Sequence, residues 1–154
     1  MSRAFVKEGD GAEGEPLAEL QVSPHRNLVT AAGLAQIHGN VERLRSELSA
    51  AREGGDRGVL QRVQRDLRYW SARQGTAELV PSPAPGGKAR FGSVVRLEGE
   101  GGMALTYRIV GEDEADPAAG KISYVSPIGR ALIGRAAGDK VRLRAGVAEV
   151  VTIE

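Results

Sequence analysis

Few side chains in this sequence belong to the types that carry a chemical centre. Cysteine is absent, which excludes disulfide frameworks, thiolate zinc sites and cysteine nucleophiles. The two histidines, His25 and His38, lack partner ligands at the fixed spacing that a metal site needs. We therefore expect no metal site, and we expect His38 on the exposed surface of a helix.

Arginines form the second group with chemical potential: Arg62, Arg65, Arg68 and Arg73. Guanidinium groups on one helix can contact the phosphates of RNA or DNA. The alternative is a solvated helix face on which the arginines pair with carboxylates such as Glu42, Glu47 and Asp66. The net charge of the 154 residues is only +1, which disfavours autonomous DNA binding.

The arginines lie on the second arm of a predicted helical hairpin, residues 30–79. Apolar residues recur at steps of three and four, the period of a coiled-coil seam, at Leu34, Ile37, Val41, Leu44, Leu48 and Ala51 and again at Leu60, Val63, Leu67, Trp70, Gln74 and Ala77. Thr30 is the predicted N-cap. Three glycines within residues 53–58 predict the turn, and about 22 residues per arm give a rod roughly 30 Å long.

The segments that flank the hairpin are predicted to be irregular. Residues 1–29 carry five acids and three bases with little to bury, which predicts a flexible acidic tail. Charged residues interrupt residues 1–11, and no stretch approaches the roughly 18 apolar residues of a membrane span, so we expect a soluble, cytoplasmic protein. Prolines at alternate positions make residues 80–87 a linker.

Residues 88–154 have the pattern of a small β domain. Short strand-like runs at residues 91–97, 104–110, 121–125, 140–144 and 147–153 are separated by glycine turns. One short helix interrupts them, with Ser126 as its N-cap, Pro127 at its first position and Gly134 as its stop. The expected fold class is α+β: an antiparallel helical hairpin followed by an antiparallel sheet with one covering helix.

Residues 86–154 resemble the C-terminal domain of the GreA/GreB transcription elongation factors. The resemblance combines, in one order, the strand Leu105-Thr106-Tyr107-Arg108-Ile109-Val110, an acidic loop, the turn Ile122-Ser123-Tyr124-Val125-Ser126-Pro127, the helix Arg130-Ala131-Leu132 and the turn Gly138-Asp139. It implies an FKBP-like domain without prolyl isomerase activity that grips a coiled coil at the rim of the RNA polymerase secondary channel. By position, Ser123, Val125, Ser126 and Pro127 are then the expected partner-binding residues. On physical grounds alone, the acidic loop is expected to be solvated.

The hairpin resembles the N-terminal domain of the same family. Ala51-Arg52-Glu53-Gly54-Gly55-Asp56 is similar to the family's entry to the hairpin tip. In members that stimulate transcript cleavage, two tip acids help the polymerase hold a second magnesium ion. Asp56 matches the first acid and is the candidate catalytic residue. Val59 stands at the position of the second acid, for which Glu53 is the alternative. The arms are about one heptad shorter than in those members, which removes roughly 10 Å of reach.

These resemblances predict a non-enzymatic, monomeric regulator of elongation that binds RNA polymerase at the secondary channel without stimulating cleavage. No cofactor of its own is expected, and the polymerase magnesium would be shared only if the tip were active. Nucleic acid is a possible contact inside the complex. The alternatives are an active cleavage factor, a protein like the regulator of nucleoside diphosphate kinase, and, outside this class, an isomerase or chaperone.

Overall fold

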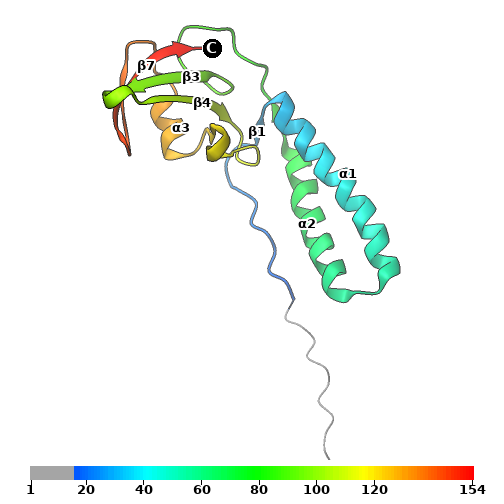
Figure 1. Cartoon of the computed structure of the whole chain (residues 1–154). Coiled ribbons are helices and arrows are strands. Elements are labelled where there is room, and N and C mark those ends of the chain that lie inside the picture. Colours follow the sequence, from blue (N-terminus) through cyan, green and yellow to red (C-terminus); the bar gives the residue numbers. More distant parts are fainter. Residues whose placement is uncertain (1–15) are drawn as a thin grey trace, which may run out of the picture.

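The computed structural model describes residues 16–154 as a helical hairpin that projects from a β-rich domain (Figure 1). The first half of the predicted acidic tail lies outside the described residues. The α+β fold class and the order of its two parts are as predicted. Among residues 16–154, no helix is long and apolar enough to cross a membrane.

The hairpin consists of α1, Ala31–Gly54, and α2, Arg57–Thr76. The Thr30 side chain caps α1 by accepting a hydrogen bond of 3.0 Å from the Gly33 amide, as predicted. The seam residues Ile37, Val41, Leu44 and Val63 are buried between the arms. The turn is tighter than predicted, because α1 continues to Gly54, and only Gly55, with φ of +71°, and Asp56 separate the helices.

The C-terminal domain is a five-stranded sheet with one short helix across it. Its strands are β3 (Val94–Gly99), β4 (Ala104–Val110), β5 (Lys121–Ser123), β6 (Lys140–Leu143) and β7 (Gly146–Ile153), in the order β5-β4-β3-β7-β6. Two short 3-10 turns, Glu100–Gly102 and Pro117–Ala119, connect strands. The helix α3, Pro127–Leu132, buries Leu132 against a core that includes Val95, Leu97, Ile109 and Val150.

The sheet is not wholly antiparallel, which corrects the predicted topology. β4 and β5 pair in parallel through Arg108–Lys121, Ile109–Ile122 and Val110–Ser123. The acidic loop, residues 111–120, carries the chain back along β4 so that β5 runs in the same direction. The loop thereby lies at the end of the sheet that faces the hairpin (Figure 1).

The last part of the predicted tail is an ordered element of the fold. β1, Leu28–Val29, pairs in parallel with β2, Glu78–Leu79, so the two ends of the hairpin are joined. Asn27 is buried at 4% exposure. Residues 23–29 therefore differ from a flexible tail, because backbone pairing and side-chain hydrogen bonds hold them.

Candidate docking site, hairpin tip and junction

The predicted partner-binding residues form a corner between β5 and α3, here named the docking segment, residues 123–127. The Ser126 hydroxyl accepts a hydrogen bond of 3.1 Å from the Gly129 amide and donates one of 2.6 Å to the Ser123 carbonyl oxygen. Pro127 occupies the first helical turn, where its missing amide proton costs nothing. At Gly129 a Cβ atom would stand 2.1 Å from the Ser123 carbonyl oxygen, so the corner is close-packed as well as capped.

An apolar pocket of about 520 Å³ opens beside this corner. Three of the four predicted residues, Ser123, Ser126 and Pro127, line it, whereas Val125 is not among its lining residues. Its other walls come from β4, the acidic loop, β5, α3 and β6: Tyr107, Ala115, Pro117, Ile122, Ile128, Ala131 and Leu143.

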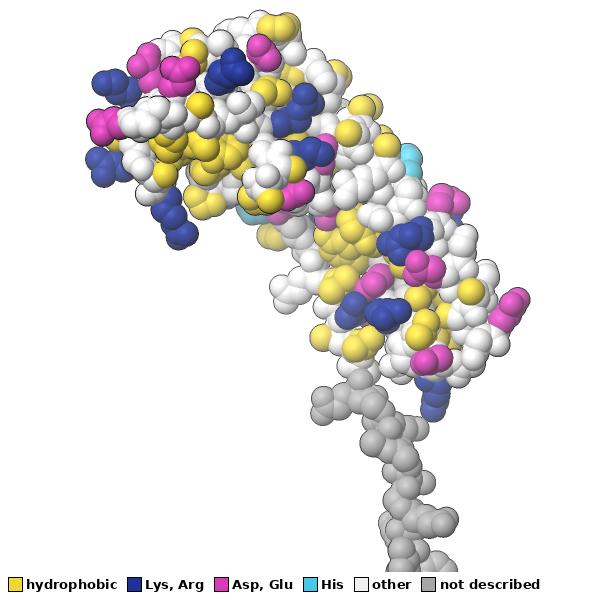
Figure 2. Space-filling model, in the orientation of Figure 1, with side chains coloured by type: hydrophobic (Ala, Val, Ile, Leu, Met, Phe, Trp, Pro, Cys, Tyr) yellow, Lys and Arg dark blue, Asp and Glu magenta, His cyan; other side chains and the backbone are white. Residues whose placement is uncertain are grey.

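The edge of the pocket on the β6 side is basic. Arg142, on β6, and Arg144, just after it, line the pocket and are exposed. Figure 2 shows a hydrophobic patch on the C-terminal domain with Lys, Arg, Asp and Glu side chains around it. Such a surface suits a partner that presents an apolar side chain next to a carboxylate.

At the hairpin tip, the Asp56 carboxylate has a structural task. Asp56 is the N-cap of α2, and its side chain accepts a hydrogen bond of 3.1 Å from the Val59 amide. Glu53 lies in the last turn of α1 and is exposed, as is Asp56. Within residues 16–154, no group of three or more His, Cys, Asp or Glu side chains is arranged to hold a metal ion. His38 is exposed on α1, as predicted.

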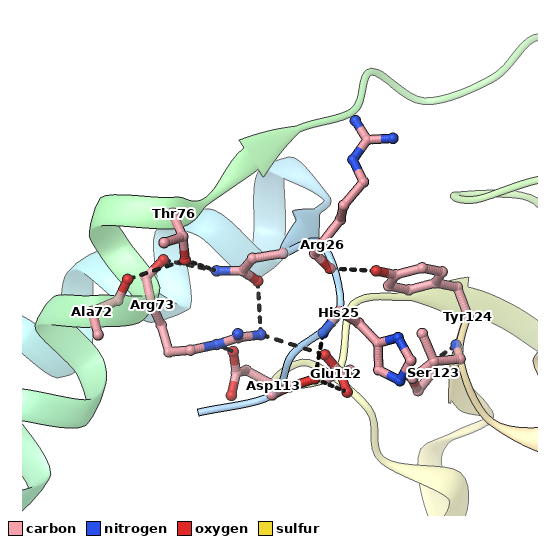
Figure 3. Close-up of polar contacts among 12 residues, drawn as sticks. His25, Arg26, Ala72, Arg73, Thr76, Glu112, Asp113, Ser123 and Tyr124 are labelled. Atoms are coloured by element: carbon pink, nitrogen blue, oxygen red, sulfur yellow. Dashed lines mark hydrogen bonds and ion pairs between the residues drawn. The ribbon is translucent and has the colours of Figure 1, made fainter. Parts of the chain in front are cut away.

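The junction between hairpin and domain is built around a buried arginine that the sequence placed on a solvated face. Arg73 is 1% exposed. Its Nε donates a hydrogen bond of 2.6 Å to Asp113 Oδ2, and its Nη2 donates one of 2.8 Å to Asn27 Oδ1 (Figure 3). Glu112 Oε2 lies 3.8 Å from the same guanidinium. Of the two interpretations of the α2 arginines, the solvated helix face is therefore wrong for Arg73.

The acidic loop supplies the partners at this junction, which corrects the prediction that it is solvated. The Tyr69 hydroxyl donates a hydrogen bond to Asp113. Thr30 Oγ1 donates one of 2.6 Å to Glu114 Oε2, and Glu114 is only 7% exposed. Burial, followed by the hydrogen bond to Asp113, raises the pKa of Tyr69 from 10.0 to about 12. The loop thus carries the carboxylates that fasten both helices to the domain.

The other arginines of α2 lie nearer to the predicted arrangement. Arg65 pairs with Asp66 at 2.8 Å, and both side chains are partly exposed. Arg68 is exposed and pairs with Glu19, a residue of the N-terminal segment. Arg62 is also exposed. Only Arg73, at the end of α2 next to the domain, is withdrawn from solvent.

Comparisons with known proteins find matches to the C-terminal domain and to most of the chain. Residues 84–154 match the family model described as transcription elongation factor, GreA/GreB, C-terminal. The chain is 35% identical to the transcription elongation factor GreA of Syntrophobacter fumaroxidans, over 97% of this chain and 95% of the relative. It is 39% identical to GreA of Legionella pneumophila, over 87% and 82%. The crystal structure of GreA factor homolog 1 of Thermus thermophilus is 25% identical, with a TM-score of 0.41, over 84% of this chain and 99% of that one.

Proposed function

Because this chain belongs to the GreA/GreB family of transcription elongation factors, we propose that it binds RNA polymerase at the secondary channel and regulates elongation without stimulating transcript cleavage. It acts as a binding protein, and any RNA hydrolysis in the complex belongs to the polymerase. The observation that supports the proposal is the apolar pocket beside the docking segment, which is lined by three of the four residues that the family resemblance indicates, Ser123, Ser126 and Pro127.

The pocket supports docking through its shape and its chemistry. It buries an apolar side chain of the partner between Ile128 and Tyr107, while Ser123 and Ser126 hold the corner in place through hydrogen bonds within the chain. Burial of apolar surface contributes about 25 cal/mol per Å², so one large side chain in this pocket contributes roughly 2 kcal/mol. The basic edge adds attraction for an acidic partner and accelerates encounter at low salt.

The tip supports the absence of cleavage stimulation. Two carboxylates are needed to share a magnesium ion with the polymerase, and Val59 stands where the second would be. The first, Asp56, is engaged as the cap of α2. The reach of the tip is also limited by the length of the helices. α1 has 24 residues and α2 has 20, so the shorter helix is only about 30 Å long at 1.5 Å per residue.

A binding experiment with purified RNA polymerase tests the docking site. We expect Ile128→Lys to weaken binding at least tenfold, because it places an ammonium group in the apolar pocket, and the double variant Ser126→Ala, Pro127→Ala to weaken it less. The matched control is Val151→Lys, which changes an exposed valine outside the pocket. Equal affinity of wild type, folded Ile128→Lys and the control would place the interface elsewhere.

A further inference from the structure

The N-terminal segment contacts both the hairpin and the C-terminal domain through residues 23–27, here named the clasp. On the hairpin side, the Asn27 side chain makes three hydrogen bonds. Its Nδ2 donates to the Arg73 carbonyl oxygen at 2.8 Å and to Thr76 Oγ1 at 3.2 Å, and its Oδ1 accepts from Arg73 Nη2 at 2.8 Å. Because Asn27 is buried, each of these bonds is costly to lose.

On the domain side, the clasp reaches the acidic loop and the docking segment. Ser23 Oγ donates a hydrogen bond of 2.9 Å to Glu112 Oε1. The Tyr124 hydroxyl donates one to the carbonyl oxygen of Arg26 (Figure 3). Tyr124 lies within the docking segment, and its ring packs edge-on against Phe91 at a centroid distance of 5.5 Å. The clasp therefore contacts one residue of the docking segment, Tyr124, and one residue of the acidic loop, Glu112.

Backbone packing next to the clasp is close. Gly111, at the start of the acidic loop, lies so close to Leu28 that a Cβ atom would stand 2.3 Å from the Leu28 carbonyl oxygen. Leu28 also begins β1, which pairs with β2 at the end of the hairpin. One short stretch of chain is thus fixed to the hairpin by its backbone and to the domain by direct contact.

We propose that the clasp is a positioning element that fixes the direction of the hairpin relative to the docking segment. A side chain at position 27 that lacks an amide leaves Arg73 to the acidic loop alone and removes the side-chain hydrogen bonds between the clasp and the end of α2, while the backbone pairing with β2 remains. The direction of the hairpin then depends on the contacts of α1 and α2 with the acidic loop alone, and it varies over a wider range than in the unchanged chain. The inference concerns the free protein and does not depend on the polymerase as partner.

The absence of native cysteine makes this directly measurable. Spin labels on Arg57→Cys at the tip and Lys140→Cys on β6, both exposed positions, report the distance between hairpin and domain. We expect one narrow distance distribution in the otherwise unchanged chain. Asn27→Ala should broaden it, and Tyr124→Phe, which removes only the hydroxyl, should broaden it to a smaller extent.

The matched control lies inside the clasp. Arg26→Ala removes an exposed ion pair with Glu78 but keeps the backbone carbonyl that Tyr124 uses, so its distribution should stay narrow. Circular dichroism checks that each variant is folded, and Tyr124→Phe serves as the test if Asn27→Ala is not. Distributions of Asn27→Ala and Tyr124→Phe as narrow as that of Arg26→Ala would overturn the proposal.

Discussion

Replacing Asp113 with alanine should destabilise the protein strongly, because the buried guanidinium of Arg73 loses its nearest carboxylate. The Arg73 and Asp113 side chains are 2% and 11% exposed, and their closest atoms lie 2.6 Å apart. Removing one partner of a buried ion pair costs about 3–5 kcal/mol. We expect about 3 kcal/mol, the lower end of that range. Asn27 Oδ1 at 2.8 Å and Glu112 Oε2 at 3.8 Å still face the guanidinium in the variant.

Urea unfolding measured by tryptophan fluorescence gives the free energy directly. The single tryptophan, Trp70, lies on α2 with its ring 5.1 Å from that of Tyr69, so its emission reports on the junction. The matched control is Arg43→Ala, which removes a hairpin ion pair whose side chains are 55% and 44% exposed. Exposed helix pairs contribute only about 0.3–0.5 kcal/mol. If Asp113→Ala is no less stable than this control, the buried pair does not hold the junction and the reasoning is refuted.

Three further predictions concern the junction and the tip. Burial and a hydrogen bond to a carboxylate raise the pKa of Tyr69 from 10.0 to about 12 in the folded protein. The stability that its neutral form contributes is therefore complete below pH 10 and is lost as the pH rises through 12, and Tyr69→Phe should reduce the alkaline loss of stability in unfolding curves. A smaller dependence remains in the variant, because burial also raises the pKa of Tyr124. Gly111→Ala should lower the melting temperature in calorimetry, because its Cβ would stand 2.3 Å from the Leu28 carbonyl oxygen; an unchanged value would show that the loop can move aside. Val59→Glu alone should leave transcript length unchanged in a cleavage assay, because the second carboxylate remains too far from the polymerase magnesium for the roughly 2.1 Å that coordination requires.

Local sequence patterns predicted the helices well because their causes are local. Apolar residues at steps of three and four define the seam, and Thr30 and Ser126 cap helices through amides only three residues away. The short strands and their glycine turns could be predicted for the same reason. The parallel direction of β5 could not be predicted in this way, because it depends on the path of the acidic loop through space.

The junction could not be predicted from periodicity. Arg73 stands one residue before the seam position Gln74, so the helical period assigns it to the solvent side. Its partner Asp113 lies 40 residues later in the chain. α2 in fact packs on two sides, against α1 and against the acidic loop. The hydrophobic period indicates only the side that faces α1, because the side that faces the acidic loop is polar. The density of carboxylates between residues 112 and 116 was the available signal, because a loop so acidic requires basic partners if it is buried.

The central claim is that the protein binds RNA polymerase without stimulating transcript cleavage. The most direct test uses a stalled, backtracked complex of purified RNA polymerase, in which binding and RNA length are measured in the same sample. We expect the protein to bind the complex and to leave the transcript at its original length. The Ile128→Lys variant should lose the binding, which ties the result to the pocket. Rapid shortening of the RNA by the unmodified protein, abolished by Asp56→Ala, would contradict the account and make the protein an active cleavage factor.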